Sequence, residues 1–391
     1  PAGAYPTDCD VEVTCAPPGA TIRYTINGQA PILIDAAIGE GESLFLSGSV
    51  ALRARAWKDG MEPSDVAGAE YHITGDIASG QNHVLALQCG GQAFSWGKNN
   101  QGQLGRSQGD QDEVHPVPTV ANGLNVATGQ EHSLALREDG TVWAWGANDQ
   151  GQLGDNTTSA RSSPVQVVGL SQIVQVAAGY DFSLALKADG TVWAWGENAY
   201  GQLGVGTTAN SKVPLQVPGL AGAVEVAAGR NHALVRLSDG SVRAMGQNGS
   251  GQLGDGSTTD RPSPVSAIGL SNIVHIGAGR SHGLAVDHAG QLFSWGSGID
   301  GALGLGDTSD RLIPNPIPGQ TNAVVIGSTL GRFSLVIDAQ GQLWGWGRNA
   351  ERQLGDGTTT SRSTPKRITT IGPVVGCRGG EYSGYAALAD G

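Results

Sequence analysis

The chain has 391 residues, of which 15% are charged and 39% hydrophobic, and glycine is unusually frequent at 62 residues. This composition is typical of a folded protein and argues against disorder. The formal net charge of −12, without any run of Lys or Arg, makes nucleic acid a poor ligand because an acidic surface repels phosphates. No stretch approaches the roughly 18 apolar residues of a membrane span, so no membrane insertion is expected.

The first 74 residues differ in pattern from the rest and predict a small domain. Strand-like runs at 20–26 and 50–57 alternate with turns at Asn27-Gly28 and Asp59-Gly60, which indicates a small antiparallel sandwich. The segment resembles the immunoglobulin-like β-sandwich at the C-terminus of chitobiases and β-hexosaminidases, a module found in many bacterial surface proteins. The resemblance implies a spacer or accessory domain at 1–74, followed by a second domain at 75–391.

The four cysteines do not settle the redox compartment. Cys9 and Cys15 are six residues apart, about 20 Å on a straight strand, so a disulfide between them requires a turn of the chain. Cys89 and Cys377 lie far apart in the sequence, and we expect both to be free.

From residue 75 onward the sequence repeats with a period of about 50 residues. The tetrapeptide Gly-Gln-Leu-Gly or a degenerate copy starts six times, at intervals of 49, 50, 50, 50 and 51, at Gly102, Gly151, Gly201, Gly251, Gly301 and Arg352. A Trp-Gly pair precedes the copies at a constant offset, with Trp at positions 96, 145, 195, 295 and 346 and Met245 in the remaining repeat. A fixed period of this length indicates a repeat architecture.

One period predicts one blade of a β-propeller. Two apolar runs, Ser183–Leu186 and Thr191–Trp195, flank Asp189-Gly190, a dipeptide that readily takes the positive φ angles of a hairpin turn. A polar loop and two further short strands, around Val217 and at Val224–Ala228, follow without helical periodicity. Four strands in about 50 residues are typical of a propeller blade.

The pattern Asp-Gly-Thr-Val-Trp-Ala-Trp-Gly, Gly-Gln-Leu-Gly and His-Ser-Leu-Ala-Leu resembles the repeat of the regulator-of-chromosome-condensation family. The resemblance implies an all-β fold with a seven-bladed propeller. The half of the repeat that contains Gly-x-x-His occurs seven times, but the Trp-Gly half occurs six times. We therefore expect the seventh blade to lack partner strands within this chain. Either the natural protein continues past Gly391 or another segment fills the gap.

Four histidines recur at one position of the repeat and invite a metal interpretation. Equivalent positions on separate blades are much farther apart than the ~2 Å between a metal and its ligand. We expect these histidines to hydrogen-bond backbone within their own blades: His83, His132, His232 and His282. No metal site and no cofactor are predicted.

The other repeated polar and aromatic residues are interpreted as parts of the fold. We expect four tryptophans to fill the core from inner strands rather than stack on sugars: Trp143, Trp145, Trp193 and Trp195. An asparagine series is interpreted as turn residues: Asn148, Asn198, Asn248 and Asn349. Calcium takes six to eight oxygens, more than the repeated loops at Asp155, Asp255 and Asp356 offer.

The residues between Gly and His vary among the repeats and are our candidates for a binding site. Turns of this kind lie on one face of a propeller, near its central channel, and variable positions on a rigid ring are free to recognise a partner. In the secreted bacterial β-lactamase-inhibitor relatives that this repeat resembles, the corresponding turns contact the partner. The predicted partner-binding residues are Gln81, Asn82, Gln130, Glu131, Tyr180, Asp181, Phe182, Arg230, Asn231, Arg280, Arg332, Phe333 and Tyr382.

These observations predict a binding scaffold without enzymatic activity, located outside a bacterial cell or on its surface. The favoured partner is a protein, with a glycan as the weaker choice. Three alternatives stay open: a structural surface or fibre subunit that self-associates through the incomplete blade, a guanine-nucleotide exchange factor, and a polysaccharide-active enzyme whose site is hidden in propeller loops.

Overall fold

The computed structural model describes residues 3–5, 9–12, 20–25, 31–32, 37–38, 43–46, 50–58, 61–73, 76–88, 91–106, 111–320, 322–372 and 374–388. The chain divides into two compact units, and each is described here by itself. One unit comprises Pro1–Asp76 with Gln88–Gly91, and the other comprises Ile77–Leu87 with Gln92–Gly391. Within the described ranges, no helix is long and apolar enough to cross a membrane.

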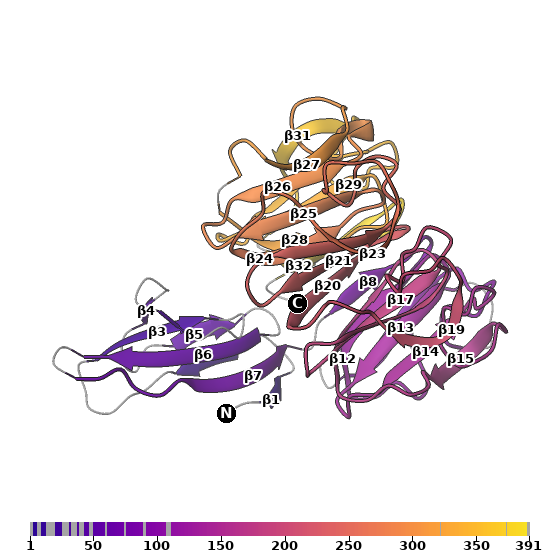
Figure 1. The fold of residues 1–391 in the computed structure, drawn as a ribbon, viewed down its shortest axis with the longest axis horizontal. Helices are drawn as coiled ribbons and strands as arrows, with labels where there is room; N and C mark the ends of the chain where they lie inside the picture. The colour runs from indigo at the N-terminus through magenta and orange to yellow at the C-terminus, as the bar shows by residue number, and fades with distance from the viewer. Residues whose placement is uncertain are drawn as a thin grey trace. The chain divides into compact units, whose positions relative to one another are not determined.

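The N-terminal unit contains a five-stranded sheet and a two-stranded sheet, with strands that pair antiparallel except for the first and last, which pair parallel (Figure 1). The larger sheet has the order β1-β7-β6-β3-β4, formed by β1 (Gly3–Tyr5), β7 (Ala67–Ile73), β6 (Val50–Trp57), β3 (Thr21–Thr25) and β4 (Ala37–Ile38). The smaller sheet pairs β2 (Cys9–Glu12) with β5 (Ser43–Leu46) in antiparallel register. Cys15, Cys89 and the side chain of Cys9 lie outside the described residues. The predictions about a Cys9–Cys15 disulfide and a free Cys89 therefore stay predictions.

The second unit is a β-propeller of seven sheets, six of which have four strands each. Blade one contains β8 (Ile77–Ser79), β9 (His83–Leu87), β10 (Ala93–Gly97) and β11 (Gln111–Pro116). Blade two contains β12 (Gly123–Thr128), β13 (His132–Arg137), β14 (Val142–Gly146) and β15 (Arg161–Gln166). Blade three contains β16 (Ile173–Ala178), β17 (Phe182–Lys187), β18 (Val192–Gly196) and β19 (Ser211–Gln216).

The remaining blades follow the same pattern until the last. Blade four contains β20 (Ala223–Ala228), β21 (His232–Leu237), β22 (Val242–Gly246) and β23 (Arg261–Ser266). Blade five contains β24 (Ile273–Ala278), β25 (His282–Asp287), β26 (Leu292–Gly296), the 3-10 turn η1 (Ile299–Gly301) and β27 (Arg311–Pro316). Blade six contains β28 (Ala323–Gly327), β29 (Phe333–Asp338), β30 (Leu343–Gly347) and β31 (Arg362–Arg367). Among the described residues, blade seven has two strands, β32 (Val374–Gly379) and β33 (Gly384–Leu388), as expected.

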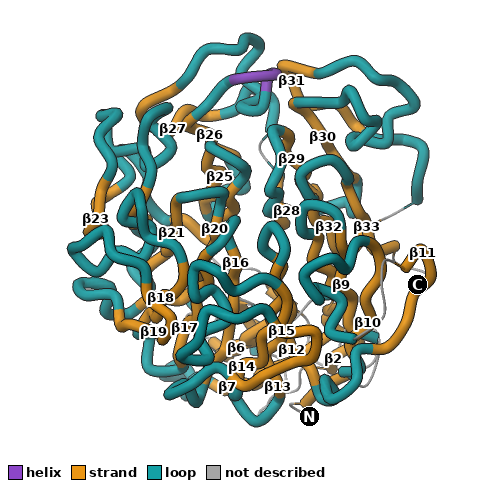
Figure 2. The backbone as a smooth tube through the Cα atoms, turned by 90° about the vertical axis from the view of Figure 1, so that its right-hand side faces the viewer, coloured by secondary structure: helices purple, strands orange, loops and turns teal. Residues whose placement is uncertain are grey.

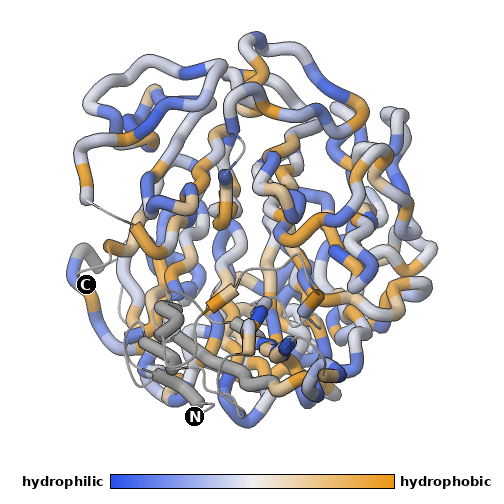
Figure 3. The backbone as a smooth tube through the Cα atoms, turned by 90° about the vertical axis from the view of Figure 1, so that its left-hand side faces the viewer, coloured by the Kyte–Doolittle hydropathy of each residue, from blue (hydrophilic) through white to orange (hydrophobic). Residues whose placement is uncertain are grey.

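Each blade begins at the central axis and is built outward in chain order (Figure 2). The predicted hairpin of blade three is confirmed: β17 and β18 pair antiparallel with Leu186 opposite Val192. Gly190 closes the turn at φ +79°, a conformation that costs glycine nothing. Hydrophobic residues gather in the strands, and the loops between them are mostly polar (Figure 3).

Consecutive blades are joined by a repeated set of hydrogen bonds. The carbonyl of Gln103 in blade one accepts hydrogen bonds from Trp145 Nε1 and Ser133 Oγ of blade two, both at 2.9 Å. The same arrangement links Gln152 of blade two to Trp195 and Ser183 of blade three. These tryptophans are fully buried, so they fill the core as expected. Trp143 and Trp193, in contrast, are only partly buried, and all four tryptophans lie on the third strand of their blades.

Three of the four repeated histidines, His83, His132 and His282, also link blades, which corrects the expectation that they bond within one blade. His83 Nε2 lies 2.9 Å from Ser133 Oγ, and His132 Nε2 lies 3.0 Å from Ser183 Oγ, in each case across to the next blade. Because the serine hydroxyl donates its proton to a glutamine carbonyl, the histidine Nε2–H is the donor to serine. Burial lowers the pKa of His83 to about 4, so the ring is neutral in the fold.

Candidate functional site

The Gly-x-x-His turns and the loops that follow the Trp-Gly pairs lie on one face of the propeller. In each blade the two are hydrogen-bonded through the backbone: Ala147 N donates to Glu131 O at 2.8 Å, and Arg348 N donates to Arg332 O at 2.9 Å. The glycine of the Trp-Gly pair permits this contact, because a Cβ on Gly146 would lie 2.4 Å from Glu131 O. We call this surface the Gly-x-x-His face.

The turns are also linked to one another around the axis. In blades one to five the first variable residue of the turn donates its backbone N–H to the carbonyl of the corresponding residue of the next blade, at 2.8 to 3.3 Å. The series runs from Gln81 through Gln130, Tyr180, Arg230 and Arg280 to Gly331, which accepts the last bond. In blade six, Leu330 occupies the position of the glycine and Gly331 the first variable position, one residue earlier than the sequence pattern suggested. This series of hydrogen bonds holds the turns of blades one to six in fixed relative positions.

Glu381, which we did not include among the predicted site residues, is the centre of a polar cluster at the axis. Its carboxylate accepts hydrogen bonds at 2.8 Å from Gln81 Nε2 and from the Tyr180 hydroxyl, and pairs with the Arg280 guanidinium. Its side chain is 6% exposed. Burial alone would raise its pKa, but the Tyr180 hydrogen bond and the Arg280 charge outweigh burial and hold the pKa below its ordinary value.

Two further predicted residues surround this cluster. Gln130 Nε2 donates to Gln81 Oε1 at 3.2 Å, and the Arg230 guanidinium stacks over the Tyr180 ring at 4.4 Å from its centroid. Residues from six of the seven blades therefore meet around the axis at this end of the propeller. We call Gln81, Gln130, Tyr180, Arg230, Arg280 and Glu381 the axial cluster. The sequence could have indicated Glu381 as the one acid at this position of the repeat.

The second variable residue of each turn lies outside the axial cluster. Over blades two and three these residues and the adjacent loops are acidic: Glu131, Asp149, Asp181 and Glu197. Burial, together with the charges of Glu197, Asp149 and Glu131, raises the pKa of Asp181 to about 7. Glu131 is bound by Lys98 at 3.0 Å. This part of the face carries an excess of negative charge.

Over blades five to seven the same face carries arginines, each paired with an acid, beside an exposed aromatic ring. Tyr382 is 38% exposed, and the Arg348 guanidinium lies 5.8 Å from the centroid of its ring. Arg332 pairs with Asp300 at 3.6 Å, and the neighbouring Ile299 is 47% exposed. Exposed Tyr and Arg side chains on a rigid surface are typical of the residues that dominate protein interfaces.

Phe182 and Phe333 correct part of the predicted partner-binding set. Both side chains are fully buried in the histidine position of their blades, so neither can contact a partner. Asn231 is 9% exposed and nearly buried as well. The remaining predicted residues divide into the axial cluster and an outer set on the same face: Asn82, Glu131, Asp181, Arg332 and Tyr382.

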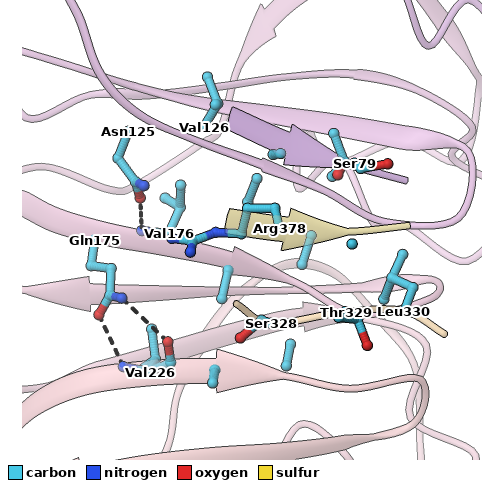
Figure 4. Close-up of a pocket in the computed structure, with 18 of the residues that line it drawn as sticks. Ser79, Asn125, Val126, Gln175, Val176, Val226, Ser328, Thr329, Leu330 and Arg378 are labelled. Atoms are coloured by element: carbon cyan, nitrogen blue, oxygen red, sulfur yellow. Dashed lines mark hydrogen bonds between the residues drawn. The ribbon is translucent and has the colours of Figure 1, made fainter. Parts of the chain in front are cut away.

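A central channel of about 130 Å³ lies beneath the axial cluster, lined by the first strand of every blade. Figure 4 shows Arg378 of β32 reaching into it, while Asn125 accepts a hydrogen bond from Val176 N at 2.9 Å and Gln175 bonds both backbone groups of Val226. The carboxylate that lines the channel, Glu225, pairs with Arg236 at 2.8 Å. The polar side chains of Asn125, Gln175 and Glu225 in this channel are therefore bound to the backbone or to a side chain of the protein itself.

The repeated asparagines organise the outer loops, as the turn interpretation predicted. Asn148 Oδ1 accepts from Leu153 N at 3.0 Å, and its Nδ2 donates to Asp155 Oδ1 at 3.1 Å. The Asp155 carboxylate is in turn bound by Arg161 at 2.7 Å, so an internal cation occupies the place that calcium would take. Within the described part of the chain, no group of three His, Cys, Asp or Glu is arranged to hold a metal ion. Cys377 is free and buried, as expected.

The repeated blades, the ring of turns and the interblade tryptophans define a seven-bladed β-propeller of the regulator-of-chromosome-condensation type. The family model for the RCC1-like domain matches residues 39–386, and the chain belongs to this family. The family model for the chitobiase/β-hexosaminidase C-terminal domain matches residues 1–68. No curated protein matches the chain.

Solved structures show the same fold. Human WBSCR16 is 22% identical, with 95% of this chain and 99% of that chain covered and a TM-score of 0.73. Yeast RCC1 (Prp20), in a crystal structure with Kap60, is 25% identical, with 80% of each chain covered and a TM-score of 0.71. Prp20p from Saccharomyces cerevisiae, in a study of its binding to Gsp1p and histones, is 22% identical over 96% of this chain and 93% of that chain, with a TM-score of 0.71.

Proposed function

We propose that this chain is a protein-binding module that contacts its partner with the Gly-x-x-His face. The observation that carries the proposal is the division of that face into an acidic part over blades two and three and a part over blades five to seven where acid-paired arginines lie beside the exposed Tyr382. The turns of blades one to six are held by one series of backbone hydrogen bonds. A rigid surface with separated charges favours one orientation of a protein partner and disfavours others.

The relatives support this class of function. Yeast RCC1 (Prp20) was crystallised with Kap60 bound, so a protein that contains a propeller of this type forms a complex with another protein. The extracellular or cell-surface location stays a prediction, to be tested by fractionating the source cells. Glycan binding, nucleotide exchange and self-association also stay predictions.

Site-specific photocrosslinking tests which face binds. A photoreactive residue at Tyr382 or Asn82 should crosslink to one discrete protein, because both side chains are exposed on the Gly-x-x-His face. The same group at Ala289, an exposed residue in the turn between β25 and β26 on the opposite face, is the control and should give no such product. Crosslinking from Ala289 alone would reject the proposed face.

Two arginines provide a matched pair of variants once the crosslinked partner is purified. Arg348 stacks on Tyr382 and pairs with Glu351 on the Gly-x-x-His face, whereas Arg137 stacks on Trp143 and pairs with Asp139 on the opposite face. Arg348→Glu should weaken binding at least about 10-fold, the scale of one interface hot spot. Arg137→Glu should change binding less than about twofold. Equal effects would show that the charge change acts through stability.

A further inference from the structure

The loop that follows the Trp-Gly pair in blade five lacks two side chains that organise this loop in blades one to four and six. In blade two, Asn148 accepts a hydrogen bond from the N–H of Leu153 at 3.0 Å, and Gln152 accepts one from the backbone N–H two residues before it at 2.9 Å. The same two bonds recur in blades one, three, four and six. In blade five Gly298 replaces the asparagine and Ala302 replaces the glutamine. Neither bond can form there, so this loop can take another backbone path.

The backbone of the blade-five loop differs accordingly. Ala302 N donates to Ile299 O at 3.2 Å and closes the 3-10 turn η1, in which Asp300 takes φ +62° (Figure 2). At the same position of the other described loops, no residue has a positive φ. A Cβ on Gly298 would lie 2.2 Å from Ser309 O, so the asparagine of the other blades does not fit this conformation. The conformation is therefore specific to blade five.

This loop presents the large apolar side chain of Ile299 to solvent. The side chain is 47% exposed on the Gly-x-x-His face, where Ser297 N donates to Ser281 O in the turn of the same blade at 2.8 Å. The equivalent residues of the other loops are polar or small: Asn100, Asp149, Ala199, Gly249 and Ala350. Burial of Ile299 against a partner would remove apolar surface from water, which favours binding.

Arg332 lies beside this loop and carries N–H donors that the fold does not use. Its guanidinium is 3.6 Å from the Asp300 carboxylate, beyond the roughly 2.7–2.9 Å of a charge-assisted hydrogen bond, and its side chain is 39% exposed. Arg348 on the same face, in contrast, makes two hydrogen bonds to Glu351, at 3.0 and 2.6 Å. The backbone of Arg332 is fixed, because its carbonyl accepts the N–H of Arg348 at 2.9 Å. Arg332 can therefore take a carboxylate from outside without loss of a strong ion pair.

We propose that Ile299 and Arg332 together recognise a segment of a partner protein in which an apolar side chain stands beside a carboxylate. This inference rests on the proposed function and gives the partner a chemistry. The apolar side chain packs on Ile299, and the carboxylate replaces Asp300 on Arg332, whose planar guanidinium can bind a carboxylate with two parallel hydrogen bonds. The acidic part of the face over blades two and three repels that carboxylate, so it determines which way the segment lies.

A phage-displayed library of random peptides, selected on the immobilised 391-residue chain, supplies the probe. Enriched peptides should share a Leu, Ile, Phe or Trp next to, or one residue away from, an Asp or Glu. Binding of one such labelled peptide, followed by fluorescence anisotropy, should weaken at least about 10-fold with Ile299→Asp, the scale of an interface hot spot. Ile313→Asp is the matched control and should change binding less than about twofold. Ile313 is 45% exposed in the same blade but lies in the outer strand β27.

The carboxylate contact is tested by changing the peptide and the chain together. Arg332→Gln and replacement of the acid of the peptide by its amide should each weaken binding at least about fivefold. The two changes combined should weaken it no more than one alone, because both remove the same contact. Arg137→Gln on the opposite face, where Arg137 lies 3.7 Å from Asp139, is the matched control and should leave binding unchanged.

Asp300→Asn tests the exchange itself and predicts a gain. It removes the carboxylate that competes for Arg332, and Asn tolerates the positive φ of this position, so peptide binding should tighten at least about twofold. Absence of enriched peptides, a consensus with Lys or Arg in place of the acid, equal losses for the two isoleucine variants, or additive losses in the Arg332 series each overturn this inference. The proposed function fails by a different result, crosslinking from Ala289 alone, so the two failures are distinguishable.

Discussion

His232 and His132 occupy the same position in two blades, yet the same substitution should change stability in opposite directions. His132 Nε2 donates to Ser183 Oγ of the following blade. For His232 in blade four, the equivalent position in blade five is Gly283, so His232 has no such acceptor. Neither ring nitrogen of His232 finds a partner with hydrogen-bond geometry among the described residues, whereas His132 leaves one nitrogen unpaired. Phenylalanine already stands at this position in blades three and six, as Phe182 and Phe333.

We expect His232→Phe to stabilise the fold and His132→Phe to destabilise it. A buried polar group without a partner costs about 1–3 kcal/mol, and a buried hydrogen bond contributes about 1 kcal/mol. The change in ring shape is common to both variants and cancels in their difference. The free energies of unfolding should therefore differ by about 2 kcal/mol at pH 8, with His232→Phe the more stable.

Acidification adds a second, shared signature. Burial is the main reason that the pKa of His232 is lowered to about 4 and that of His132 to about 3, against about 6.5 in an unfolded chain. Each histidine contributes stability above the unfolded pKa that is lost as the pH falls toward the folded pKa, because the unfolded state binds the proton first. At pH 5 each Phe variant should therefore gain about 2 kcal/mol relative to the native chain, beyond its effect at pH 8.

Guanidinium unfolding followed by tryptophan fluorescence measures these differences at pH 5 and pH 8. The buried tryptophans of the propeller report directly on the blades. Equal destabilisation by the two variants at pH 8 would refute the assigned role of the interblade serine. An unchanged difference from the native chain between pH 8 and pH 5 would refute the neutral, buried state of both histidines.

Three further outcomes follow from the contacts described above. Glu381→Ala should lower the free energy of unfolding by about 1–3 kcal/mol, because it removes the acceptor of Gln81 and Tyr180 and the partner of the partly buried Arg280; thermal unfolding measures this. Asp181→Asn should stabilise the chain at pH 8 by about 1–2 kcal/mol and leave it unchanged near pH 4. With its pKa raised to about 7, the folded carboxyl holds a proton that the unfolded one releases, so native stability falls as the pH rises from about 4 to about 7. Asn148→Ala should cost about 2–3 kcal/mol by denaturant unfolding, because it removes the bonds to Leu153 and Asp155, whereas Asp149→Ala, an exposed neighbour, should cost little.

The sequence predicted the fold because its signals are local and repeated. Each Asp-Gly turn requires a positive φ, and each Trp-Gly pair places a large side chain next to a residue without one. Six copies at a constant spacing then determine the order of the strands. The two strands of blade seven were predictable for the same reason, since a missing half-repeat is visible in the count.

The site was only partly predictable because its geometry depends on neighbouring blades. Whether a repeated histidine has an acceptor depends on a serine of the next blade, as His132 depends on Ser183, which stands 51 positions later in the chain. Phe182 and Phe333 looked variable in the alignment of repeats, but they fill a buried position that tolerates either ring. Glu381 was missed because its importance arises from Gln81 and Arg280, which lie 300 and 101 residues away in the chain.

The two variable positions of each turn therefore carry different physical constraints. A change at the first position alters the buried contacts around Glu381 and so affects stability, whereas a change at an exposed second position, such as Asn82 or Tyr382, alters the surface alone. Charge at the second position also comes at little cost, because the carboxylates and guanidiniums there remain partly solvated, with the partly buried Asp181 as the exception. Binding specificity on this face can consequently change at the outer set without loss of the ring that holds it, which is the property expected of a recognition surface built on a repeat scaffold.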